Sequence, residues 1–267
     1  MRDQVGNLAG TESRDSEGEE AMVTTQSDAL TNYLQEIHSI FKRYSLLDIL
    51  NDGSYLKKFA DQIEHLRPQY NKNGQIDFQQ EDLLYMVRET RFAIANTILL
   101  WEIGLTPFIL DQTEYGPLSQ FFPKEVDSRF FFFVDDVFMR LYNFWNRIAN
   151  FLNIFFQIEK NPENVYFASL MDKLVSQLQH DQNFCSLLKF KKAEYKDIIN
   201  KKRRVVVHRE SSSATYFISF MKKFQNHKEV LKLQQERDEL PVFFVAQYKR
   251  MIQGLAEMLG LIKDNIK

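Results

Sequence analysis

Cysteine is almost absent from this 267-residue chain, and its scarcity excludes two kinds of stabilisation. Cys185 is the single cysteine, so the chain can form neither an intramolecular disulfide nor a thiolate metal cluster. Chains without disulfides are typical of reducing compartments. We therefore expect a cytoplasmic protein.

Long apolar runs are missing as well. Charged residues interrupt the most apolar stretches well before the roughly 18 residues that a membrane-spanning helix needs. The N-terminus is acidic and polar, and it lacks the apolar centre of a secretory signal. The sequence therefore predicts no association with a membrane.

Turn-forming residues are scarce, since the chain has nine glycines and six prolines. Between Pro162 and Pro241, the serines at 211–213 are the only stretch that breaks a helical pattern. Strands and hairpins need turn residues every 8 to 12 positions or so. The pattern thus predicts an all-α fold, an antiparallel bundle of long helices with short connections.

The first 122 residues divide into a tail and several helices. Residues 1–26 are acidic with few apolar side chains, which predicts a disordered tail. From Ser27, a candidate N-cap, apolar residues at spacings of three and four predict a helix to about Asn51. A shorter helix is expected over 55–66 and a loop over 69–78. We interpret 27–122 as a helical extension packed on a core formed by 123–267.

An apolar pattern over residues 81–108 predicts a helix with Arg91 inside its apolar face. One interpretation places Arg91 at the edge of that face, where it reaches solvent or pairs with Glu89 or Glu102. The other interpretation is a polar site inside the bundle. The pattern leaves both open.

The strongest helical pattern covers residues 126–158. One apolar stripe runs along it and predicts a largely enclosed helix: Val134, Phe138, Leu141, Trp145, Ile148, Leu152 and Phe155. Polar residues share the roughly opposite face: Asp136, Arg140, Asn143, Arg147 and Asn150. This face is either a narrow solvated stripe or the lining of a polar groove beside the basic helix that follows. The candidate groove residues are Arg140, Asn143 and Arg147.

The remaining pattern predicts four more helices. They are expected over about 163–179, from about 184 to 210, from Thr215 through Phe224, and from Pro241 toward the C-terminus. Proline is favourable in the first turn of a helix because it lacks only an N–H that would be unpaired there.

Positive charge is concentrated in residues 186–209, here called the basic segment. The whole chain has a net charge of −2, whereas this segment has nine lysines and arginines against Glu194 and Asp197. Arg203 offers a permanent charge that fits a phosphate, and His208 exchanges protons near neutral pH. Such a pair suits cleavage of an RNA phosphodiester. The candidate contacts to the RNA backbone are Lys201, Lys202, Arg204 and Arg209.

Motifs for other chemistry are not found. The remaining four histidines lack metal-ligand spacing, and there is no Gly-rich phosphate loop, nucleophile elbow or zinc signature. We expect neither a metal nor a cofactor.

Arg203 followed by His208, late in a helical bundle and after the aromatic helix around 140–147, resembles the signature of the HEPN superfamily. The resemblance covers residue 126 to the C-terminus and departs from the family pattern at Arg204, where a polar residue is common. It implies a four-helix core, usually dimeric, with the motifs of two subunits meeting at one site. Many members are metal-independent endoribonucleases, and others are inactive partners or binding domains.

The spacing of the motif raises a geometric question. On a straight helix, Arg203 and His208 point about 140° apart, because each residue turns about 100°. Distortion of the helix near 205–207 would bring the two side chains together, and so would a two-fold dimer axis.

Two functions therefore remain open. The first is a metal-independent endoribonuclease with a dimeric site, in which His208 is the general acid or base and Arg203 stabilises the phosphate. Its partners would be RNA, a second copy and a regulatory or antitoxin protein, as in defence or toxin-antitoxin systems. The alternative is a noncatalytic HEPN-like module that uses residues 189–209 to bind nucleic acid or an acidic protein.

Overall fold

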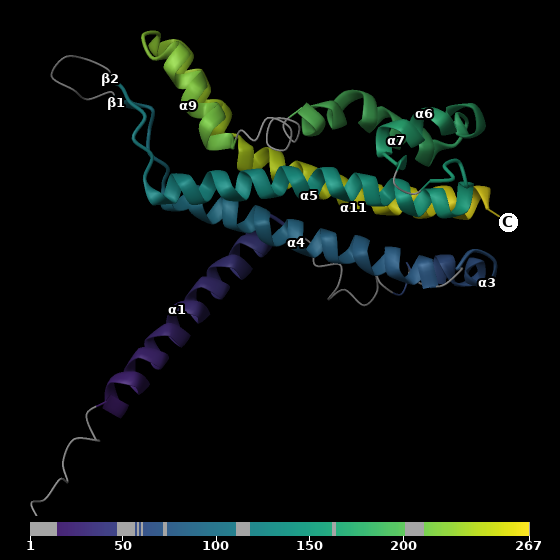
Figure 1. Cartoon of the computed structure of the whole chain (residues 1–267), viewed down its shortest axis with the longest axis horizontal. Helices are drawn as coiled ribbons and strands as arrows, with labels where there is room; N and C mark the ends of the chain where they lie inside the picture. The colour runs from purple at the N-terminus through teal and green to yellow at the C-terminus, as the bar shows by residue number, and fades with distance from the viewer. Residues whose placement is uncertain are drawn as a thin grey trace, which may run out of the picture.

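The computed structural model of the protein describes residues 15–46, 57, 59, 61–71, 74–110, 118–161, 164–200 and 211–266, with side chains described from residue 28 onward except at 110. Three long helices lie side by side in its centre: α4 (Gln75–Ile103), α5 (Glu125–Phe156) and α11 (Leu240–Asn265) (Figure 1). α5 runs back along α4, and α11 contacts both. The predicted all-α bundle is confirmed.

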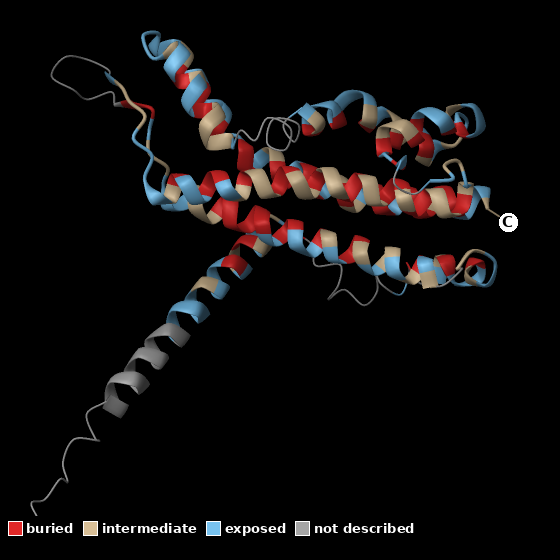
Figure 2. Cartoon of the chain, viewed as in Figure 1, coloured by how far each residue is buried: buried red, intermediate tan, exposed pale blue. Residues whose placement is uncertain are grey.

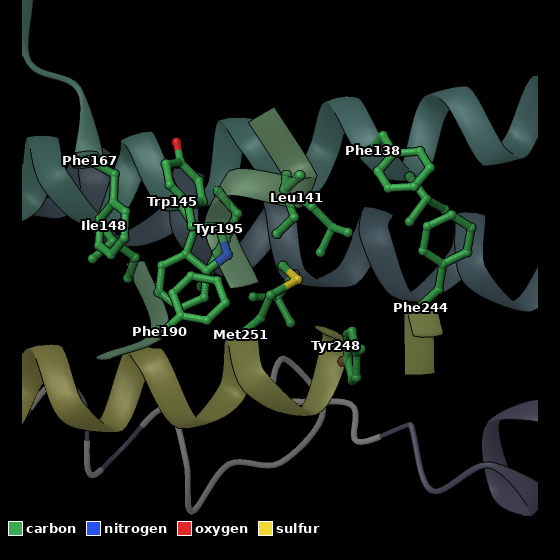
Figure 3. Packing of buried hydrophobic residues seen from close by; sticks show 14 of the residues in the cluster. Phe138, Leu141, Trp145, Ile148, Phe167, Phe190, Tyr195, Phe244, Tyr248 and Met251 are labelled. Carbon is green, nitrogen blue, oxygen red and sulfur yellow. The ribbon is translucent and has the colours of Figure 1, made fainter. Parts of the chain in front are cut away.

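The core forms where these helices face one another, as the buried surfaces in Figure 2 show. All seven residues of the predicted α5 stripe are buried, and Trp145 is completely enclosed. Phe138 of α5 meets Phe244 of α11 with ring centroids 5.0 Å apart (Figure 3). Because burying a large apolar side chain contributes about 1.5–3 kcal/mol, this stripe is a major source of stability.

The first helix, α1 (Asp15–Arg43), joins the bundle only through its C-terminal part. Ile37 and Ile40 are fully buried, and Arg43 bonds Glu102 of α4 through two nitrogens at 2.7 Å each. Toward its N-terminus the helix runs away from the bundle (Figure 1). The backbone is helical from Asp15, and the expectation of a disordered acidic tail over 1–26 stays a prediction. Acidic residues at the positive end of the helix dipole favour this extension. Residues 1–14 lie outside the described residues.

A tight turn replaces most of the predicted loop over 69–78. The 3₁₀ turn η1 (Glu64–Leu66) leads into the short helix α3 (Arg67–Tyr70), and α4 begins at Gln75. The Asn71 side chain accepts a hydrogen bond from the Ile76 N–H and donates one to Asp77, both at 2.8 Å. Gly74 takes the left-handed conformation that the turn requires, with φ of 71°.

The far end of α4 also differs from the prediction of a helix to residue 108. Gly104 has φ of 111°, and α4 ends before it at Ile103. The chain then forms a small antiparallel hairpin, in which Ile109 of β1 (Ile109–Leu110) pairs with Ser119 of β2 (Leu118–Ser119). The sequence pattern does not predict this hairpin.

The region between α5 and α11 packs on these two helices, on the side away from α4 (Figure 1). It begins with α6 (Phe167–Leu178) and α7 (Gln182–Phe190), followed by the π-turn η4 (Lys191–Tyr195), which continues as a helix over 196–200. After the gap come α9 (Ser212–Lys223) and α10 (His227–Asp238). α10 is not predicted, whereas the start of α11 around Pro241 is confirmed. In the part of the chain that the structure describes, no helix is long and apolar enough to cross a membrane.

Candidate nucleic-acid interface

The structure describes the two ends of the predicted motif but not the motif itself. Arg203 and His208 lie within residues 201–210, here called the motif segment, which falls outside the described residues. The same is true of the four predicted RNA contacts in that segment. The geometry of the site is therefore that of the residues leading into the segment and out of it.

The chain enters the motif segment through an aromatic anchor. Tyr195 and Ile198 are buried. The Tyr195 ring is parallel to that of Tyr142 on α5, with centroids 6.4 Å apart and planes 4° apart, and it meets Phe167 edge-on at 5.0 Å (Figure 3). Its hydroxyl donates to Asn146 at 3.4 Å. Burial raises the pKa of Tyr195, so the phenol stays protonated and acts in packing.

The π-turn that ends at Tyr195 lets two aromatic residues face the core. Phe190 and Tyr195 are both buried, yet five residues of α-helix would point them about 140° apart. The wider turn at 191–195 brings both inward. Gln247 of α11 donates a hydrogen bond to Glu194 at 2.9 Å and ties the turn to the bundle.

The chain leaves the motif segment through a polar anchor. Ser211 caps α9 by accepting a hydrogen bond from the Ala214 N–H at 3.1 Å. The N–H and the hydroxyl of Ser212 both donate to the carboxylate of Asp135 on α5. Burial raises the pKa of Asp135, and the bonds from Ser212 oppose that rise.

Both anchors therefore lie on the same helix. Tyr142 and Asp135 are seven residues apart on α5, which places them two turns, or about 10 Å, apart along its axis. Because the inner face of α5 is buried in the bundle, the described residues on either side of the motif segment are tied to a rigid support.

Cations precede the motif segment on the exposed surface. Lys189, Lys192 and Lys196 are exposed, and their side chains form no hydrogen bond or ion pair with the described residues. Lys191 is mostly covered and binds Asp172. The first three lysines can therefore meet an incoming phosphate without breaking a contact to the described part of the chain.

The polar face of α5 lies against α4 and forms ion pairs with it. Arg140 donates to Asp136 at 2.8 Å and also bonds Glu89 of α4, while Arg147 pairs with Asp82 at 2.5 Å. Asn143 is half-buried. The two arginines are thus committed to acidic residues, which neither interpretation of the sequence anticipates.

A polar cavity of about 720 Å³ does open near the C-terminal end of this face. Arg147 and Asn150 line it together with Gln75 and Gln79 from the start of α4. It lies toward the end of α5 that is away from Asp135, so it does not extend the motif site.

Arg91 is buried within the apolar face of α4, with only 8% of its surface exposed. Its guanidinium carbon lies 3.5 Å from the centre of the Phe41 ring, which is a cation–π contact between α4 and α1. The two acids proposed as its partners bond other arginines, Glu89 to Arg140 and Glu102 to Arg43. Arg91 therefore helps to hold α1 on the bundle.

Among the described residues, no group of three or more histidine, cysteine or acidic side chains is arranged to hold a metal ion. The sequence pattern does not single out Asp135, although this residue fixes the outgoing end of the motif segment. The available signal is a pair of adjacent aspartates, 135 and 136, within a strongly apolar helix.

Comparison with known proteins identifies a family. A family model described as Cthe2314-like HEPN matches residues 102–267, which is more than half of the chain. The matched region includes both anchors, the motif segment and all helices from α5 to α11. No curated protein and no solved structure matches the chain.

Proposed function

The chain belongs to the Cthe2314-like HEPN family, and on this premise we propose that it is a metal-independent endoribonuclease whose site contains Arg203 and His208. The observation that carries the proposal is that α5 holds both ends of the segment with these residues, through Tyr142 and Asp135. A site that must orient an imidazole and a guanidinium needs such a support.

The proposed reaction is a transesterification within the RNA. The 2′-oxygen attacks the adjacent phosphorus and loses its proton, and the 5′-oxygen of the next nucleotide leaves and gains a proton. His208 carries out one of these proton transfers, and Arg203 stabilises the charge that develops on the phosphate oxygens. The products are a 2′,3′-cyclic phosphate and a free 5′-hydroxyl.

RNA would approach over a path of cations. We propose that Lys201, Lys202, Arg204 and Arg209 contact its backbone close to the site, and that the exposed lysines before the segment extend this path. Each phosphate contact adds affinity without sequence preference and makes binding salt-dependent.

A second copy would complete the site. α9 follows the motif segment directly and exposes a row of apolar residues, in which Phe217, Met221 and Phe224 are 45%, 51% and 44% exposed. Because residues at these spacings share one helical face, we propose that this face forms a dimer interface. The dimer would bring the motifs of two subunits together, which resolves the angle of about 140° between Arg203 and His208 on one straight helix.

We also propose where the enzyme acts and what controls it. The enzyme is cytoplasmic, and a regulatory or antitoxin protein inhibits it in a defence system. We also propose that the minimal HEPN bundle begins near residue 123 and that residues 27–122 add helices to it, although the family match starts at 102.

The test is incubation of the full chain with mixed single-stranded and structured RNA in excess EDTA, with the products resolved on a denaturing gel. Wild type should cleave, and both His208→Ala and Arg203→Ala should lose at least about a hundredfold in rate. The matched control is His180→Ala, because His180 is exposed on a turn outside the segment.

Three outcomes are informative. Cleavage by wild type and His180→Ala alone, with cyclic phosphate ends, supports the proposal. Equal cleavage by His208→Ala overturns the assigned site. RNA that is retained in a salt-dependent shift assay but never cut supports the noncatalytic binding module instead.

A further inference from the structure

One apolar face of α1 is covered by the bundle along only half of its length. Two helices that pack as a coiled coil meet along apolar residues at spacings of three and four, and α1 has this pattern at Leu30, Leu34, Ile37 and Phe41. In the C-terminal half, Ile37 is buried and Phe41 contacts Arg91 of α4. In the N-terminal half, Leu30 is 58% exposed and Leu34 is 40% exposed, because α1 runs away from the bundle there (Figure 1).

The exposed half of this face adjoins exposed aromatic residues of α4. Tyr33 lies between the two leucines in the sequence and meets Phe92 of α4 edge-on, with ring centroids 6.4 Å apart. Phe92 is 41% exposed and Tyr85 is 58% exposed. Because they are seven residues apart, these two side chains share one face of α4. We call Leu30, Leu34, Tyr85 and Phe92 the α1–α4 surface, and an exposed apolar surface of this kind is typical of a binding site for another protein.

Acidic residues surround the apolar part of this surface. Residues 15–41 of α1 include six acidic side chains and no lysine or arginine. Two of the six, Asp28 and Glu36, are exposed next to the leucines. On α4, the exposed Arg88 is balanced by the exposed Glu81. The α1 side of the surface therefore determines its sign, which is negative.

The neighbouring stretches of sequence do not reverse that sign. Residues 1–14 and residues 47–60, which include the parts of the chain next to α1 that are not described, each contain two acidic and two basic residues. Their net contribution by formal charge is zero. Complementary charge favours a basic partner and disfavours an acidic one.

We propose that the α1–α4 surface binds an amphipathic helix of a partner protein, with aliphatic residues along one stripe and lysines or arginines on both flanks. A helix is the fitting shape, because the uncovered residues of α1 continue a face that already packs on a helix. A second copy of this chain fits less well, since its own α1 would bring six more acidic residues to an acidic surface. The proposal is independent of RNA cleavage, because its residues lie outside the motif segment.

The experiment measures fluorescence anisotropy of a labelled peptide as the full chain is added. The peptide consists of leucine and lysine, patterned as an amphipathic helix of about five turns. Leu30→Lys removes an apolar contact and places a positive charge against the peptide, so it should weaken binding at least about tenfold. The matched control is Leu231→Lys on α10, where the leucine is 55% exposed, and it should bind as wild type does.

The charge is tested separately. A peptide with glutamate in place of lysine should bind at least about tenfold more weakly than the lysine peptide. Glu36→Gln should weaken binding of the lysine peptide severalfold, whereas Glu236→Gln, at an exposed residue of α10, should not change it. Thermal unfolding of every variant checks that the fold is retained, which is expected because each substituted residue is exposed.

The outcomes separate the possible occupants. Binding of the lysine peptide that weakens in Leu30→Lys and is unchanged in Leu231→Lys supports the proposal. No binding to wild type, or equal affinity in wild type and Leu30→Lys, overturns it. Equal affinity for the glutamate peptide overturns the assignment to a basic partner. Light scattering without peptide tests the second copy, because a mass that falls in Leu30→Lys but not in Leu231→Lys would show that another copy of the chain covers the surface.

Discussion

Asp135 and Ser212 are joined by three hydrogen bonds across two helices, because both the N–H and the hydroxyl of Ser212 donate to the Asp135 carboxylate. The contact links the first turn of α9 to the N-terminal third of α5. It fixes the point at which the chain returns from the motif segment.

Replacing Asp135 should separate the role of its oxygen atoms from that of its charge. Asp135→Ala leaves the Ser212 donors without an acceptor, and we expect the free energy of unfolding to fall by about 1–3 kcal/mol. Asp135→Asn keeps an acceptor oxygen and should cost less. Urea unfolding of both variants at neutral pH measures the difference.

The same pair should show a defined pH dependence. Burial raises the pKa of Asp135 in the folded state, so its carboxyl binds a proton more readily there than in the unfolded chain. The stabilisation from this protonation is complete below the unfolded pKa of about 3.9 and is lost as pH rises through the folded pKa. Relative to Asp135→Asn, wild type should thus become less stable between acidic and neutral pH. A constant difference between the two proteins across that range would contradict the raised pKa.

Two glycines of α11 should respond differently to the same substitution. A Cβ added at Gly254 would lie 2.6 Å from the Trp145 ring, which is enclosed and in contact with Phe190. Gly254→Ala should therefore lower the free energy of unfolding by about 1–3 kcal/mol. At Gly260 the new Cβ would meet only the end of the Asn183 side chain.

Gly260→Ala is the matched control for this substitution. The Asn183 side chain can move, and alanine gains about 0.5–1 kcal/mol over glycine in a helix. We expect its stability to remain within about 1 kcal/mol of wild type. Chemical unfolding of the two variants measures the free energy of unfolding of each. Equal destabilisation would show that Trp145 does not limit the space for a side chain at position 254.

The exposed lysines should govern how RNA affinity depends on salt. Substituting Lys189, Lys192 and Lys196 with alanine should weaken binding of all RNA sequences to a similar extent. On single strands, it should lower the slope of log affinity against log salt by up to about 0.7 for each phosphate that a lysine no longer neutralises. Filter binding over a series of salt concentrations measures the slope. Lys42→Ala on α1 is the control and should leave it unchanged.

The apolar row on α9 should govern oligomeric state. Met221 is 51% exposed, so Met221→Glu is expected to leave the monomer folded and to disrupt a dimer by placing a charge in its interface. Light scattering after size exclusion measures the mass. Phe78→Glu, at a residue of α4 that is 68% exposed, is the control. A monomeric wild type, or a dimer that survives Met221→Glu, would exclude this face as the interface.

The sequence predicts the central bundle well, because apolar residues recur at helical spacing along its long helices. In α5 the apolar stripe repeats from Val134 to Phe155, and this length averages out local exceptions. The start of α11 is predicted from Pro241, because the first turn of a helix does not need the N–H that proline lacks. The HEPN resemblance, which rests on Arg203, His208 and the aromatic helix before them, is confirmed by the family match.

Other features depend on contacts that a one-dimensional pattern does not contain. The break before α10 depends on Asn226, whose side chain caps the helix by accepting a hydrogen bond from the Glu229 N–H. A single asparagine in a sequence is a weak signal for the start of a helix, so α10 is not predicted. The partners of Arg140 and Arg147 lie on α4, more than 50 residues earlier. Whether a polar face meets solvent, a groove or another helix is decided by that packing.

The π-turn at 191–195 sets the direction in which the chain leaves the bundle. It holds one residue more per turn than an α-helix would, and the surplus rotates everything after it by about 100°. The described helix over 196–200, with the exposed Lys196, therefore faces about 100° away from the direction that an uninterrupted α-helix of the same residues would give it. A chain with the same lysine after an uninterrupted α-helix would present that charge to a different side of the bundle.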